Sequence, residues 1–78
     1  MKQTIERKIK MRPGEAKQFV SIACRCDFDI DISYNRYVVD AKSILGVLGL
    51  DFSHILTVSY NGYNEELENC LKSYSVAC

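Results

Sequence analysis

A strictly alternating stretch at residues 27–32 constrains the fold more than any other feature, because acidic and apolar residues take turns along it. Successive side chains of a β-strand point to opposite faces of its sheet. Phe28, Ile30 and Ile32 therefore share one face, and Tyr34 extends it. The pattern predicts a strand with one face on a hydrophobic core and the other in water.

Further strands are predicted on both sides of this one. The dipeptide Asn35-Arg36 suits a tight hairpin turn without the usual glycine at its second position, so residues 37–40 form the returning strand. Residues 4–11 also alternate, with Arg7 as a charged exception on the apolar face. Residues 55–60 are rich in β-branched and aromatic side chains, which favours a fourth strand.

Three helices are predicted between and after these strands. The first carries one apolar stripe at helical spacing, made of Ala16, Phe19, Val20, Ala23 and Cys24. A short apolar helix follows Ser43 and ends at Gly49, and a final helix begins at about Asn64, which is a suitable cap. The apolar positions of this last helix are Leu67, Cys70, Leu71 and Tyr74.

The predicted element order is β-α-β-β-α-β-α over a single domain, residues 1–78. We therefore expect an α+β fold of the open-faced β-sandwich type. In it, three helices cover one face of a four-stranded antiparallel sheet.

Charge and hydropathy exclude several classes of function. Ten basic and ten acidic residues give zero net charge, which argues against a protein that neutralises many phosphates of a nucleic acid. No apolar run approaches the roughly 20 residues of a membrane span. The charged N-terminus lacks the apolar core of a signal peptide, so we expect a cytoplasmic protein with reduced cysteines and no membrane partner.

Cysteines and the lone histidine are the only candidate metal ligands of the usual soft type. Cys24, Cys26, Cys70 and Cys78 contain no C-x-x-C pair, and His54 is the one imidazole. Cys24 and Cys26 are two residues apart, which points them to different faces of a helix. We predict no metal site and no cofactor, with the cysteines acting as small apolar side chains.

A cluster of basic residues crowds the beginning of the chain: Lys2, Arg7, Lys8, Lys10 and Arg12. Such a cluster either meets an acidic partner or forms the solvated face of a strand, where lysines discourage aggregation. The second interpretation is the more common one for charges of this kind.

Residues 34–35 and 39–48 resemble the regulatory-serine region of HPr, the small phosphocarrier of the bacterial phosphoenolpyruvate-dependent sugar phosphotransferase system. The second segment reads Val-Asp-Ala-Lys-Ser-Ile-Leu-Gly-Val-Leu. Residues 15–23 resemble the first helix of the same family, and the likeness covers nearly the whole chain. The resemblance implies the HPr-like fold.

The loop before the first helix departs from the family pattern. In HPr a histidine in this loop carries the phosphoryl group. An ungapped match places Arg12 at its position, and a two-residue shift places Lys10 there instead. Neither residue is the neutral imidazole that forms a labile N–P bond near pH 7. His54 lies in the connection before the fourth strand. We therefore expect no catalytic residue and no enzyme or ordinary carrier activity.

Ser43 matches the family's regulatory serine, which a dedicated kinase phosphorylates in some bacteria. The resemblance implies a phosphosite at Ser43 and a partner-binding surface made of Ile44, Leu45, Leu48 and Arg12. The implied partners are proteins: HPr kinase, a catabolite-control transcription factor or other phosphotransferase-system proteins. Alternatively, Ser43 only caps a helix.

Three functions stay open at the level of the sequence. The first is a regulatory or interaction protein that acts through Ser43 and its apolar patch. The second is an active phosphocarrier that uses an unusual residue. The third is a small α+β module that binds a metabolite or a protein and retains only the HPr shape, since a fold alone does not fix a function.

Overall fold

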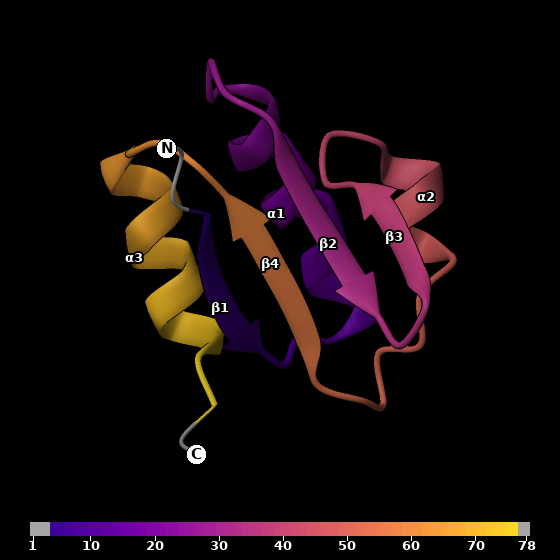
Figure 1. Cartoon of the computed structure of the whole chain (residues 1–78). Coiled ribbons are helices and arrows are strands. Elements are labelled where there is room, and N and C mark those ends of the chain that lie inside the picture. The colour runs from indigo at the N-terminus through magenta and orange to yellow at the C-terminus, as the bar shows by residue number, and fades with distance from the viewer. Residues whose placement is uncertain (1–3, 77–78) are drawn as a thin grey trace.

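The structure is a computed structural model that describes residues 4–76, and Figure 1 shows the arrangement of its elements. Four strands and three α-helices follow one another in the predicted order. Their bounds are β1 Ile5–Ile9, η1 Pro13–Glu15, α1 Ala16–Cys24, β2 Ile30–Tyr34, β3 Tyr37–Asp40, α2 Ile44–Leu48, β4 Leu56–Tyr60 and α3 Glu65–Tyr74. The added element, η1, is one turn of 3₁₀ helix that leads into α1.

The four strands form one antiparallel sheet in the order β1-β4-β2-β3. The last strand in the sequence, β4, lies between β1 and β2, so it joins the beginning of the chain to the central hairpin (Figure 1). The predicted α+β fold with a four-stranded antiparallel sheet is confirmed.

One hydrophobic core fills the space between the sheet and the helices. The sheet contributes Ile9, Ile30, Ile32, Leu56, Val58 and Tyr60 to it. The helices contribute Ala16, Phe19, Val20, Ile22, Ala23, Val47, Leu67 and Leu71. Because all three helices pack on the same cluster, the opposite face of the sheet is open to solvent (Figure 1).

The predicted hairpin is present, and the structure explains why it needs no glycine. Asn35 has a φ of 57°, whereas Arg36 does not have a positive φ. Asparagine tolerates the left-handed region better than most residues, so the turn places its one strained conformation where the sequence supplies asparagine. Tyr34 and Tyr37 close the turn as cross-strand partners.

The bounds of three strands and the orientation of one side chain differ from the predictions. Residues 55–60 form a strand only from Leu56 to Tyr60. The alternation at residues 27–32 becomes a strand only from Ile30, because the preceding residues form a bend. Residues 4–11 form a strand only from Ile5 to Ile9. Cys24, predicted on the apolar stripe of α1, is exposed, whereas Ile22 is buried. The helix ends at Cys24, so its last side chain faces the surface beside Lys42 rather than the core.

Arg7, the charged exception in β1, is exposed and forms an ion pair with an acidic residue of α3. Its guanidinium is 3.3 Å from a carboxylate oxygen of Glu68 on α3. The other carboxylate oxygen accepts a hydrogen bond of 2.6 Å from the Tyr60 hydroxyl. The Arg7–Glu68–Tyr60 network therefore fixes α3 against β1 and β4. Across residues 4–76, no helix has the length and apolar character to cross a membrane.

Candidate functional site

The loop between β1 and α1 is held by its own backbone and by Glu15. The Arg12 N–H donates a 2.8 Å hydrogen bond to the Glu15 carboxylate, and the Glu15 N–H donates a 2.9 Å bond to the Arg12 carbonyl. Met11 is buried, whereas the Arg12 side chain is exposed. The Arg12 N–H is thus already bound to the Glu15 carboxylate and is not free to bind another anion.

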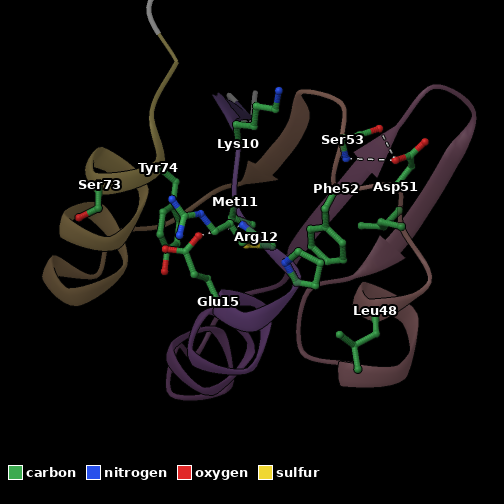
Figure 2. A pocket seen from close by; sticks show the side chains of 12 residues that line it. Lys10, Met11, Arg12, Glu15, Leu48, Asp51, Phe52, Ser53, Ser73 and Tyr74 are labelled. Atoms are coloured by element: carbon green, nitrogen blue, oxygen red, sulfur yellow. Dashed lines mark hydrogen bonds between the residues drawn. The ribbon is translucent and has the colours of Figure 1, made fainter.

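An open hollow of about 960 Å³ lies beside this loop. Figure 2 shows Arg12 on the same side as Glu15 and Tyr74, with Leu48 and Phe52 on the other side. The loop before α1, the end of α2, the 51–53 connection and the end of α3 all contribute to it. The hollow therefore brings together Arg12 and Leu48, two of the residues predicted to bind partners.

Tyr74 comes from the end of α3 and was not predicted as part of a site. Burial raises the pKa of its phenol to about 12, with further effects of Cys70 and Glu15 in the same direction. Its hydroxyl is therefore neutral near pH 7. The sequence marked Tyr74 only as a core position of the last helix, and no local signal connected it to residues more than 60 positions earlier.

The only imidazole, His54, belongs to a different cluster. Its ring stacks on Tyr34, with centroids 4.6 Å apart, and its Nε2 is 3.4 Å from Asp51. The side-chain and backbone hydrogen bonds from Ser53 hold the pKa of Asp51 below its usual value, and His54 contributes in the same direction. His54 is exposed in the connection between α2 and β4, as the sequence predicted.

Ser43 stands at the beginning of α2 as its N-cap. Its Oγ accepts a 3.3 Å hydrogen bond from the Gly46 N–H, and its own N–H donates to the Asp40 carbonyl at 2.9 Å. The side chain is exposed. The predicted capping role is confirmed, and the hydroxyl is also accessible from solvent.

The three apolar residues predicted to form a patch on α2 are not equivalent. Leu45 is 83% exposed and Leu48 is 48% exposed, whereas Ile44 is half-buried and packs against the core. Leu48 lines the hollow beside Arg12. Leu45 instead lines a second hollow, of about 600 Å³, together with Tyr37 of β3.

The cysteines occupy three different environments. Cys24 is exposed, Cys26 is buried and Cys70 is half-buried. Cys26 lies beyond the end of α1, so the prediction that it and Cys24 point to different faces of one helix does not apply. Burial raises the pKa of the Cys26 and Cys70 thiols. Within residues 4–76, no three His, Cys, Asp or Glu side chains come together in a way that suits a metal ion. Cys78 and Lys2 lie outside the described residues.

Comparisons with known proteins agree on one family. The model of the PTS-HPr family, described as the PTS HPr component phosphorylation site, matches residues 2–71. The crystal structure of a phosphocarrier protein HPr from Bacillus anthracis is 27% identical in sequence, with a TM-score of 0.68, over 94% of this chain and 98% of that chain. HPr-C-His from Thermoanaerobacter tengcongensis is 29% identical, with a TM-score of 0.62, over 94% and 92% of the two chains. No curated protein gives a significant match.

The family match covers most of the chain, and the two solved structures reproduce its fold over nearly their full length. The order of strands and helices is the one that the resemblance at residues 34–48 implied. The chain belongs to the HPr family of the phosphotransferase system.

Proposed function

We propose that this HPr-family protein is a regulatory or interaction protein rather than a phosphoryl carrier, that it is not an enzyme, and that it acts in the cytoplasm. The observation that carries the proposal is the chemistry of the loop before α1. This loop contains Arg12 and Lys10 but no imidazole. A guanidinium is always protonated near pH 7 and then has no lone pair with which to attack a phosphoryl donor.

The hydrogen bonding of the loop supports the same proposal. A phosphoryl group at Arg12 would lie at the turn whose N–H is already bound to the Glu15 carboxylate. It would also bring negative charge close to that carboxylate. His54 offers no substitute in this place, because it stacks on Tyr34 in a separate connection.

Ser43 is the residue through which we propose regulation. Its hydroxyl is exposed, and it lies within the segment that resembles the family's regulatory serine. Leu45 and Leu48, two and five residues further on, give the surrounding surface an apolar contact area. A phosphate at Ser43 would add charge beside this area and so change which protein binds there. Arg12, across the hollow from Leu48, would contribute a cation to the same interface.

The experiment is intact-mass analysis after two reactions. One contains phosphoenolpyruvate and enzyme I, and the other contains ATP and HPr kinase. We expect one added phosphate in the kinase reaction alone, and its loss in Ser43→Asn, which keeps a helix-capping side chain. Ser73→Ala is the matched control, because Ser73 is also exposed and we expect its removal to leave the label unchanged.

The other outcomes assign different functions. Label from phosphoenolpyruvate would refute the non-carrier proposal and support a phosphocarrier with an unusual acceptor. Label in neither reaction would refute the Ser43 phosphosite. The chain would then be an HPr-shaped module that binds a metabolite or a protein, and its hollow beside Arg12 would be the first place to test for a ligand.

A further inference from the structure

The two edge strands of the sheet, β1 and β3, differ in whether their outer backbone groups are paired. At the β1 edge, the segment after α3 adds a bridge between Ile9 and Ser75, and the Val76 N–H donates to the Lys8 carbonyl. At the other edge, β3 pairs only with β2 among the described residues. The β3 edge therefore presents unpaired backbone groups, which is the usual template for adding another strand.

The β3 edge is short and ends in Asp40, but it carries neither of two residues that often prevent such pairing: its sequence, Tyr-Val-Val-Asp, has no proline and no lysine. Tyr37 is 69% exposed and Val38 is 64% exposed. Leu45 is exposed nearby on α2 and lines the same hollow as Tyr37. The edge is thus apolar on both of its faces.

The register of the hairpin identifies which backbone groups are free. The Ala41 N–H donates to the Ile30 carbonyl, so these two residues form a hydrogen-bonded pair. Hydrogen-bonded pairs alternate along an antiparallel ladder, which makes Val38 and Asp40 members of the non-bonded pairs with β2. The N–H and C=O groups of Val38 and the N–H of Asp40 consequently point outward, toward any strand that is added, whereas the Asp40 carbonyl already accepts the Ser43 N–H.

Charge on the open face indicates what kind of strand fits. Asp40 lies directly opposite Asp31 on β2, an arrangement of like charges that disfavours pairing. Neither carboxylate belongs to an ion pair within residues 4–76, and neither does Arg36 in the adjoining turn. A cation placed beside Asp40 from outside would offset the repulsion.

We propose that a second copy of this chain occupies the β3 edge, in an antiparallel pair related by a two-fold axis through Val38. In this register Val38 lies opposite Val38, and Arg36, the turn residue next to β3, lies beside Asp40 of the other copy. Tyr37 lies opposite Val39 on the helix side, where each tyrosine reaches the hollow beside Leu45. The result is one continuous eight-stranded sheet.

The charge pairs give a test that is specific for this register. In Arg36→Glu alone, or Asp40→Lys alone, both cross-copy pairs become like-charged. In an equal mixture of the two variants, the mixed dimer has opposite charges in both pairs. We therefore expect each variant alone to dissociate at least about tenfold more readily than the unmodified chain, and the mixture to recover the dimer.

Sedimentation velocity from about 10 µM to about 1 mM measures the association, because mass action favours the dimer as concentration rises. Melting curves by circular dichroism check folding, which matters for Asp40→Lys because Asp40 accepts a hydrogen bond from the Lys42 N–H. Tyr37→Lys should also abolish the dimer, whereas Tyr63→Lys, at a tyrosine of similar exposure outside β3, should not.

A monomer at every concentration would overturn the proposal and leave the edge to an extended segment of another protein. A dimer that none of the β3 or Arg36 changes weakens would also overturn it, because its interface would then lie elsewhere.

Discussion

Substitution of Gly62 by alanine tests the packing of the loop after β4. An added Cβ would lie 2.4 Å from Cδ1, 2.5 Å from Cγ and 2.8 Å from Cε1 of Phe28. These distances are far below van der Waals contact, and Cγ is close to the backbone, so the ring cannot avoid the clash by a small rotation of its tip. Phe28 is half-buried and stacks on Tyr60 at 6.0 Å. The ring must therefore leave this position.

The expected loss of stability follows from these contacts. Inserting a carbon into a filled space costs about 1–3 kcal/mol of unfolding free energy. The backbone of Gly62 does not have a positive φ, so alanine adds no backbone strain and recovers about 0.4–1 kcal/mol from the unfolded chain. The net loss is about 1–2 kcal/mol, or a fall in Tm of about 4–16 °C for a domain of this size.

Urea and thermal unfolding of Gly62→Ala measure this loss, and Gly14→Ala is the matched control. No atom lies within 4 Å of a Cβ added at Gly14, which also lacks a positive φ, so alanine there should stabilise by about 0.4–1 kcal/mol. In a Phe28→Ala background, Gly62→Ala should cease to destabilise. If Gly62→Ala is as stable as the parent while Gly14→Ala behaves as expected, the reasoning about the ring is wrong.

Three other changes have definite expected outcomes. Glu68→Gln weakens the contacts of this carboxylate and should lower the unfolding free energy by about 1–2 kcal/mol, measured in urea. Burial and, after it, the hydrogen bond to Glu68 raise the pKa of Tyr60, so a spectroscopic titration of the variant should show a lower pKa for this tyrosine. Tyr74 has a pKa of about 12 in the folded protein and about 10 in the unfolded chain. Its contribution to the unfolding free energy is therefore complete below pH ~10 and is lost as pH rises toward 12. Tyr74→Phe should therefore lose less stability than the parent between these pH values in alkaline melts. Ser43→Ala should cost about 1 kcal/mol because the Gly46 N–H loses its acceptor, whereas Ser43→Asn should retain most of that energy; equal melts for the two variants would contradict the cap.

The sequence predicted the turn and the helix ends well where a single residue determines the local backbone conformation or caps a helix. Asn35 fixed the place of the hairpin, Ser43 and Gly49 bounded α2, and Asn64 capped α3. In each case the physical cause lies within four residues of the signal. Alternation at residues 27–32 overextended β2, because the pattern continues through a bend that precedes the paired residues.

Tertiary contacts decided the features that the sequence did not predict. Nothing near Arg7 indicates that Glu68 lies beside it, since the two are 61 positions apart. The residues of the candidate site fall into the same two groups, those found from the sequence and those found only from the structure. Ser43 and the exposed leucines were found from a local motif, whereas Tyr74 and the β3 edge depend on which segments the sheet order brings together.

The central position of β4 has a consequence for the order in which the chain folds. The β2–β3 hairpin needs only local contacts, but β1 has no strand partner until residues 56–60 exist. A loop of about 50 residues must therefore close before β1 and β4 can form their hydrogen bonds. Strand pairs that are this far apart in the sequence are associated with slow folding. During synthesis, the apolar side chains of β1 therefore lack their neighbouring strand until the last third of the chain arrives, and misassembly is most favoured in this interval.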